Sequence, residues 1–334
     1  MRTNSTTQSE ASETEKLDPN AKAKSFSYTK LILNLGISAA ILYALWKFAD
    51  IDVSKLITEI KSTDMFWFGL CCLGFLVQIF TSAYKWRKLT ALLDYKLGYW
   101  QAVHMYFQAT FSNSFLPSNF GGDALRAYKL AKDGDRNWIK AASTVLVERL
   151  FGFMVMFSMI PIGLILLKQS GLESNFEPKL IYLLWLGFAG MVAGIASYKL
   201  WSRIPFGPIQ KINYAVEVYT KCHKSITSVI VWTYFTHGIL LLSNIAAAKS
   251  VGVALHQIPI WYWFLLLPAC TLASFVIPSV RGLGAKEACY VYFLAFLGVS
   301  SEQSLAVAFL CFAAFLITSL PGITLVLRRI FHHH

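Results

Sequence analysis

Apolar runs of about 20 residues recur along this chain from Leu31 to Leu327. A run of that length is what an α-helix needs to cross the ~30 Å hydrocarbon core of a bilayer. Hydrophobic residues make up 56% of the 334 positions and charged residues only 14%, whereas a soluble domain carries roughly 25% charged residues. The sequence therefore predicts an all-α membrane protein that crosses the bilayer several times.

Six of the apolar stretches are long enough to be full spans, and two others are interrupted. The predicted spans are residues 30–49, 65–84, 141–167, 180–199, 226–247 and 303–327. Residues 98–134 and 257–299 each contain an apolar helix, a Pro-Ser turn followed by glycines, and a second short helix. We expect six full transmembrane helices plus two helical hairpins.

The basic residues predict how the chain is oriented. They gather in residues 1–30, 85–97, 126–140 and 199–225, while the connections between these segments carry few. The positive-inside rule assigns the basic segments and both termini to the cytoplasm, which places the protein in the cell (inner, cytoplasmic) membrane. Segments 85–97 and 126–140 then lie on one side, so residues 98–134 should form a re-entrant hairpin and residues 257–299 an opposed one. The net charge of +12 is explained by the anionic membrane surface, not by nucleic acid.

The chain is expected to form one membrane domain. Residues 1–28 are polar and charged with no core to bury, which predicts a disordered cytoplasmic tail. Residues 29–331 form the predicted transmembrane domain, and the histidines at 332–334 are interpreted as a tag remnant.

Two halves of this domain, 65–167 and 226–327, read as an inverted repeat. An offset of 161 carries Pro117 onto Pro278, and an offset of 162 carries the span 141–167 onto 303–327. Inverted repeats whose broken helices meet near the bilayer midplane are typical of transporters.

The first break combines helix-ending residues with charged ones. Pro117 should end the preceding helix, and Gly121 and Gly122 permit the positive φ of a turn. Asp123 is placed to cap the next helix, whose free N–H groups can bind an anion, and Arg126 adds a bidentate donor suited to phosphate. This pattern favours a headgroup site. The alternative is a cytoplasmic turn with a capped amphipathic helix and a snorkelling arginine.

The second break repeats these residue types at Pro278, Arg281, Gly282, Gly284, Lys286 and Glu287. It is predicted to be a second gate or half-site. The alternative is an outer loop whose charges are solvated.

The pair Glu148-Arg149 lies inside the predicted span 141–167. An ionisable residue in a membrane span is costly, so it usually faces a cavity or a partner. Adjacent helix positions point about 100° apart, so each side chain should meet a group on another element. The candidate partners of Glu148 are Arg126, Arg281 and Lys286, and those of Arg149 are Asp123, Glu287 and a substrate phosphate. A structural ion pair or snorkelling is the alternative.

Other polar residues in the apolar segments have simpler explanations. Asn113, His237 and Asn244 are expected to make interhelical hydrogen bonds, with Asn113 supporting the first break. Trp86 and the neighbouring Lys85, Arg87 and Lys88 are interpreted as an interfacial anchor. The six cysteines are interpreted as small buried hydrophobic residues. No phosphate-binding loop, zinc-protease motif or nucleophile elbow is visible, so neither cofactor, nor metal, nor enzymatic activity is predicted.

These residues resemble a known family, the lysylphosphatidylglycerol synthetase transmembrane (flippase) family, which includes the membrane half of the bacterial multiple peptide resistance factors. The likeness covers most of residues 29–327. It is carried by Leu116-Pro117, Gly121-Gly122-Asp123, Arg126, Val147-Glu148-Arg149, Pro278, Gly282-Leu283-Gly284 and Glu287. The resemblance implies transbilayer movement of a lipid, with functional residues Asp123, Arg126, Glu148, Arg149 and Glu287.

Two departures from the family pattern bear on the substrate. Arg281 stands where the family often has a glycine, which is expected to alter the accepted headgroup. The soluble aminoacyl-transferase domain is not seen in this sequence, so synthesis of the aminoacyl lipid is not expected.

The sequence thus favours a flippase-like transporter of a phospholipid or polyprenyl-linked lipid. Its expected partner is a membrane lipid with an anionic or aminoacylated headgroup, together with a homo-oligomer or a separate lipid-modifying enzyme. Two alternatives stay open, namely a membrane enzyme that modifies a lipid headgroup and a non-transporting scaffold for such an enzyme.

Overall fold

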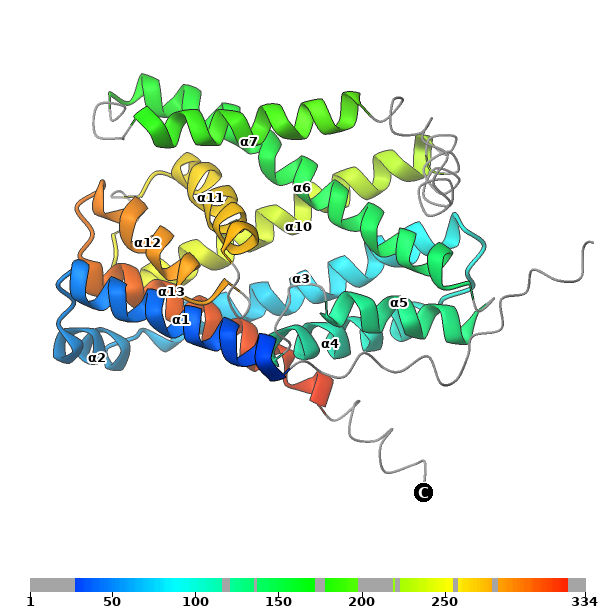
Figure 1. The fold of residues 1–334 in the computed structure, drawn as a ribbon, viewed down its shortest axis with the longest axis horizontal. Coiled ribbons are helices and arrows are strands. Elements are labelled where there is room, and N and C mark those ends of the chain that lie inside the picture. Colours follow the sequence, from blue (N-terminus) through cyan, green and yellow to red (C-terminus); the bar gives the residue numbers. More distant parts are fainter. Residues whose placement is uncertain are drawn as a thin grey trace, which may run out of the picture.

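The computed structural model describes residues 28–115, 121–134, 137–171, 178–197, 219, 223–254, 258–277 and 282–323. Over these residues the chain forms α-helices, one 3₁₀ turn and no strand, so the predicted all-α fold is confirmed (Figure 1). The elements are α1 (Tyr28–Phe48), α2 (Val53–Lys61), α3 (Met65–Ala91), α4 (Tyr99–Phe115), α5 (Gly121–Asp133), α6 (Trp138–Gln169), α7 (Pro178–Ala196), α10 (His223–Ser250), η2 (Ile260–Tyr262), α11 (Trp263–Val276), α12 (Ala285–Ala295) and α13 (Ser301–Ser319).

Several of the sequence predictions fall on residues outside the described ranges. These are the tail before residue 28, Pro117, Pro278, Arg281 and the terminal histidines at 332–334.

The long helices begin where a polar side chain caps their first turn. Asp64 accepts hydrogen bonds from the N–H groups of Phe66 and Trp67 at the start of α3. Asn137 caps α6 and Ser300 caps α13 in the same way. Such caps satisfy donors that a helix start otherwise leaves unpaired, and each of these three is followed by an apolar run.

Four helices are long and apolar enough to cross a membrane. They are Met65–Ala91, Trp138–Gln169, Ser225–Ser250 and Ser301–Ile323. The predicted spans 30–49 and 180–199 correspond to α1 and α7, whose apolar stretches are shorter, at Leu35–Phe48 and Ile181–Gly194. A multi-pass membrane fold is therefore confirmed, while the count of six full spans stays a prediction.

Helices α3 and α10 pack side by side and run in opposite directions. At one end, the N–H of Asp64 donates to the carbonyl of Ser250 at 2.7 Å. At the other, Nζ of Lys88 donates to Oγ of Ser228 at 2.6 Å. Because α3 opens one predicted repeat half and α10 the other, this antiparallel pair is what an inverted repeat requires.

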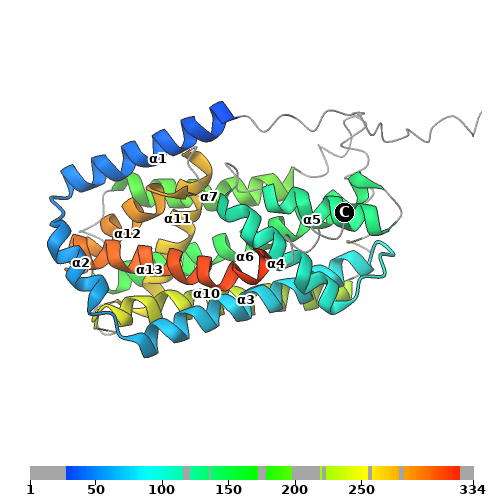
Figure 2. The same ribbon diagram turned by 90° about the horizontal axis from the view of Figure 1, so that it is seen from below.

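The two interrupted segments fold as helical hairpins at opposite ends of the bundle (Figures 1 and 2). The open end of α4 and α5 lies near the end of α3, where Tyr95 Oη donates to the carbonyl of Asn137. The open end of α11 and α12 is closed by Tyr262 Oη, which donates to the carbonyl of Phe293 at 2.6 Å. The end of α4 at Phe115 and the end of α11 at Val276 are therefore the ends away from these contacts.

The glycines at the two breaks have different backbone conformations. The predicted positive φ of Gly121 and Gly122 at the first break is wrong. Gly121 and Gly122 lie in α5 with ordinary helical backbone. A Cβ on Gly122 would sit 2.0 Å from the carbonyl oxygen of Ala109, so this glycine permits α4 and α5 to touch. Gly282 and Gly284 do have positive φ, at 77° and 89°, as a turn requires.

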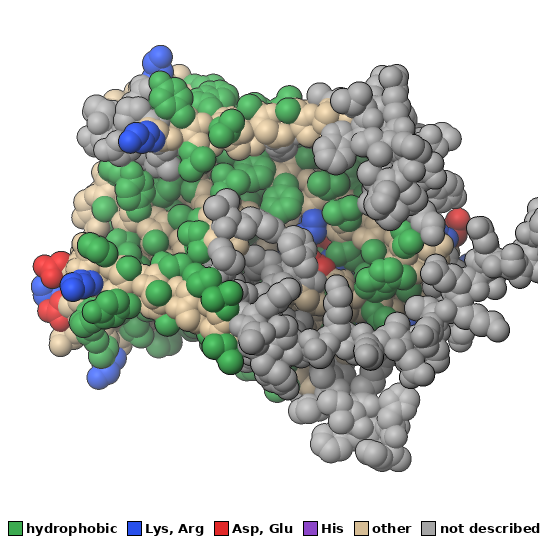
Figure 3. Space-filling model, viewed as in Figure 1, with side chains coloured by type: hydrophobic (Ala, Val, Ile, Leu, Met, Phe, Trp, Pro, Cys, Tyr) green, Lys and Arg blue, Asp and Glu red, His purple; other side chains and the backbone are tan. Residues whose placement is uncertain are grey.

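The outward faces of the helices are apolar. Figure 3 shows hydrophobic side chains over most of the described surface in that view, with charged groups at the end of the bundle beside α2 and near the centre. Large exposed side chains include Leu73, Leu150, Ile165 and Leu242, on helices that qualify as spans. Such a surface is stable against lipid tails and not against water.

Candidate functional site

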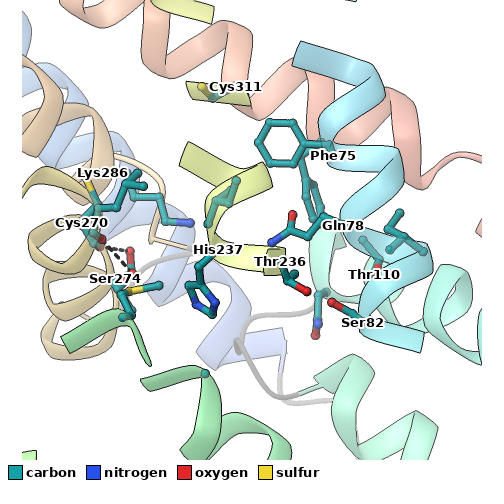
Figure 4. A pocket seen from close by; sticks show the side chains of 18 of the residues that line it. Phe75, Gln78, Ser82, Thr110, Thr236, His237, Cys270, Ser274, Lys286 and Cys311 are labelled. Carbon is teal, nitrogen blue, oxygen red and sulfur yellow. Dashed lines mark hydrogen bonds between the residues drawn. The ribbon is translucent and has the colours of Figure 1, made fainter. Parts of the chain in front are cut away.

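A cavity of about 420 Å³ lies between the two hairpins. Its lining comes from α3, α4, α5 and α6 of one predicted repeat half and from α10, α11, α12 and α13 of the other. Figure 4 shows Gln78, Ser82 and Thr110 facing it opposite Lys286 and Ser274. The cavity is therefore shared between both predicted repeat halves.

Arg126 is the centre of an ion-pair network in the first half. Its Nη1 donates to Oε2 of Glu148 at 2.7 Å, and its Nη2 donates to Oδ1 of Asp123 at 3.1 Å. The guanidinium carbon lies 4.6 Å from the ring centroid of Trp86 and 4.2 Å from that of Tyr106. Only 2% of Arg126 is exposed, which is tolerable because two carboxylates and two aromatic faces compensate its charge.

Glu148 and Arg149 point to different partners, as the helix geometry predicted. Glu148 binds Arg126 and also accepts the phenol O–H of Tyr106 in a short hydrogen bond. Arg149 donates its Nε to Oδ2 of Asp123 at 2.7 Å. Asp123 therefore bridges both arginines and joins α5 to α6.

The predicted capping by Asp123 is wrong. Its two oxygens accept from the arginines, and among the described residues neither oxygen accepts from a backbone N–H of the first turn of α5. Asn113 of α4 takes that function, because its Oδ1 accepts the N–H of Gly122 at 2.7 Å. Asn113 thus supports the first break, as expected, while Asp123 is left for the ion-pair network.

The interpretation of Lys85 and Trp86 as an interfacial anchor is also wrong. Trp86 is fully buried, stacks on Arg126 and donates its Nε1–H to Thr144 at 3.0 Å. Lys85 is 4% exposed and lines the cavity. The basic run around them suggested a surface, but the helix turns these two inward and leaves Arg87 exposed. Nothing in the spacing alone marks Lys85 as a cavity residue.

The second half contributes mostly neutral hydrogen bonds. Asn244 accepts a short hydrogen bond from Tyr290 Oη and a weaker one from Cys311 Sγ at 3.3 Å, which confirms its predicted interhelical contact. Glu287 accepts the N–H of Gly284 through Oε2 at 2.6 Å and so caps α12. Lys286 extends into the cavity, and His237 faces it from α10 (Figure 4). The interhelical hydrogen bond predicted for His237 is wrong, because its Nδ1 pairs with the carbonyl of Thr233 in the same helix at 2.9 Å.

The arrangement can hold an anion better than a cation. Among the described lining residues the carboxylates are Asp123, Glu148 and Glu287, and each already accepts protein hydrogen bonds. The side chain of Arg149 is 41% exposed, and because it lines the cavity it can offer donors there. Guanidinium groups are well suited to bidentate contacts with phosphate.

The chain matches a known protein family. Residues 31–322 match the family described as the lysylphosphatidylglycerol synthase TM region. No curated protein sequence matches the chain. The family match covers almost all the described helices and the whole of the cavity lining.

Proposed function

The chain belongs to the lysylphosphatidylglycerol synthase transmembrane family, and on that premise we propose that it moves a phosphate-bearing lipid between the two leaflets of the cell membrane. It is a multi-pass membrane protein of a lipid-related family. Movement of the lipid is the step that we add.

The observation that carries this proposal is the shared cavity. It is polar and charged within an otherwise apolar bundle, and it lies between two broken hairpins that enter from opposite ends. In transporters with this architecture, one half rocks against the other around a fixed site. A headgroup in this cavity could therefore meet either leaflet in turn while its acyl tails stay in the bilayer.

The residues have distinct parts in this mechanism. Arg149 binds the headgroup phosphate, because only its Nε is taken by Asp123. Arg126, which is nearly unexposed and held by two carboxylates, positions the others. The hairpins are re-entrant in this proposal, and both termini lie in the cytoplasm.

The test is lipid movement by purified protein in proteoliposomes. Arg149→Ala should slow the movement of a fluorescent phospholipid about 10–100-fold, because a charged hydrogen bond contributes about 1.5–3 kcal/mol. Arg87→Ala is the matched control, since Arg87 is an exposed arginine that donates to the carbonyl of Leu97 outside the cavity. It should retain the wild-type rate.

Equal rates in Arg149→Ala and wild type would refute this mechanism. The same vesicles also test the enzyme alternative. Mass analysis of the lipids before and after incubation should find the headgroups unchanged, whereas a new headgroup would identify an enzyme.

A further inference from the structure

We propose that the cavity selects a headgroup of net negative charge by holding its phosphate between Lys85 and Arg149, and that it discriminates against aminoacylated headgroups. This inference rests on the proposed lipid-moving function and names the substrate class. It also adds Lys85, a residue that the sequence pattern assigned to the membrane surface, to the binding site.

Lys85 is a buried lysine whose ammonium group makes no hydrogen bond or ion pair in the described part of the chain. It is 4% exposed and lines the cavity. The charges of Glu148, Arg126 and Arg149 act on Lys85, which therefore stands beside the ion-pair network without a direct ion pair to it. A buried ammonium group costs free energy unless an anion compensates it, and a bound phosphate would supply that anion.

Arg149 is the second cation proposed to bind the phosphate. Its Nε is taken by Asp123, while its two terminal nitrogens have no partner in the described ranges. They are the part of a guanidinium that binds two phosphate oxygens at once. One phosphate could therefore take a point charge from Lys85 and a fork of donors from Arg149.

The carboxylates of the cavity already accept hydrogen bonds, two of them from arginines, so they attract an added ammonium group more weakly than free carboxylates do. Both oxygens of Asp123 are bound by arginines. The two oxygens of Glu148 are bound by Arg126 and Tyr106, and Glu287 caps its own helix. A lysyl headgroup would place two further cations beside Lys85 and Arg149, where like charges repel.

The test compares two probe lipids with identical acyl chains in the same nanodiscs, phosphatidylglycerol and lysylphosphatidylglycerol. Native mass spectrometry counts the lipids retained by the purified protein, and proteoliposomes give the rate of movement for each. Wild type should retain and move phosphatidylglycerol at least about 10-fold more than lysylphosphatidylglycerol, the ratio expected for one charged contact.

Lys85→Met should lower the preference for phosphatidylglycerol over lysylphosphatidylglycerol below about 3-fold. The variant should stay folded, because an apolar side chain of similar length replaces a buried charge. Lys88→Met is the matched control. It removes a lysine from the same helix, but Lys88 is bonded to Ser228 and stacked on Tyr84 outside the cavity. Its ratio should match wild type.

Retention of both lipids to the same extent, or an unchanged ratio in Lys85→Met, would overturn the inference even if lipid moves. Preferential retention of phosphatidylglycerol that depends on Lys85, without movement of either lipid, would support the inference and refute the proposed function. Inorganic phosphate and the soluble headgroup glycerophosphoglycerol serve as competitors. Displacement of lipid by inorganic phosphate at equal concentration would identify free phosphate as the ligand and overturn the choice of a lipid.

Discussion

The two hairpins meet at one cavity but are held together by different forces. At the first, Arg126 and Arg149 join α5 to α6 through two carboxylates, and aromatic rings of α3 and α4 contact the guanidinium of Arg126. At the second, neutral hydrogen bonds to Asn244 join α12 and α13 to α10, and the carboxylate of Glu287 caps α12. The backbone pattern is shared, whereas the charge is concentrated in one half.

The two predicted repeat halves share an order of helices but differ in the charged residues that they carry. With the predicted repeat offset of 162 residues, the positions of Glu148 and Arg149 in α6 correspond to Leu310 and Cys311 in α13. The first half therefore has buried ion pairs at these positions, whereas the second half has a leucine and a cysteine at the equivalent positions. Under the proposed function, the first half would thus supply the charged groups that bind the headgroup, and the second half an apolar surface at the corresponding position.

Substitution of Arg126 should lower the stability of the protein more than any other change proposed here. Arg126→Met leaves the buried carboxylate of Glu148 without its cation, which costs about 3–5 kcal/mol when one member of a buried pair is lost. We expect a large fall in the thermal unfolding midpoint in detergent. The counterpart in the second half, Glu287→Gln, keeps an oxygen for the N–H of Gly284 and should cost less than about 1 kcal/mol.

A double variant shows whether charge is the cause. Arg126→Met with Glu148→Gln removes both charges and should recover part of the lost stability. If Arg126→Met alone unfolds at the wild-type temperature, the first hairpin is not held by ion pairs, and the contrast between the halves disappears.

The glycines at the breaks give a second, smaller test. Gly122→Ala would place a methyl group 2.0 Å from a backbone oxygen of α4, and overpacking of this kind costs about 1–3 kcal/mol. Gly238→Ala has nothing within 4 Å and should be neutral or gain up to about 1 kcal/mol from helix propensity. Thermal unfolding of the two variants measures the difference.

Gly284→Ala should also destabilise, by about 1–3 kcal/mol, but through backbone strain at φ 89°. Its new methyl group would lie 2.9 Å from Cβ of Ile41 in α1. A cysteine placed at Ile41 should therefore react faster with a thiol reagent in the Gly284→Ala background, and not in the Gly122→Ala background. Equal labelling rates would mean that both glycines act in the same way.

The tyrosines provide the finest comparison. Tyr106 donates to a carboxylate and Tyr290 to an amide oxygen. Hydrogen bonds to charged groups contribute about 1.5–3 kcal/mol and neutral ones about 0.5–1.5 kcal/mol. Tyr106→Phe should therefore lower the unfolding midpoint more than Tyr290→Phe, and the reverse order would contradict the assignment of charge to the first half.

The helices and the partners of the buried charges were accessible from the sequence. Apolar length predicted α3, α6, α10 and α13, and the 100° turn between Glu148 and Arg149 predicted separate partners. These inferences succeed because helix period and burial cost are local properties of a sequence.

The sequence could not place residues whose environment depends on how the helices rotate. Lys85 and Trp86 sit in a basic run typical of a membrane surface, and only the rotation of α3 turns them inward. Asp123 looks like a cap until two arginines from α5 and α6 reach it. The glycines of the first break suggested a turn, but their reason is the approach of α4, which no local pattern encodes.

The charge count around Lys85 has an electrical consequence. Asp123 and Glu148 cancel Arg126 and Arg149, so this part of the empty cavity keeps the single positive charge of Lys85. A singly charged phosphodiester brings it to zero. If the protein moves lipid as proposed, the membrane potential would do work only on the protein without bound lipid, up to about 2.3 kcal/mol per 100 mV if that charge crosses the whole field. The voltage across the membrane would thus draw the vacant site toward the negative side, whereas the filled one crosses without electrical work.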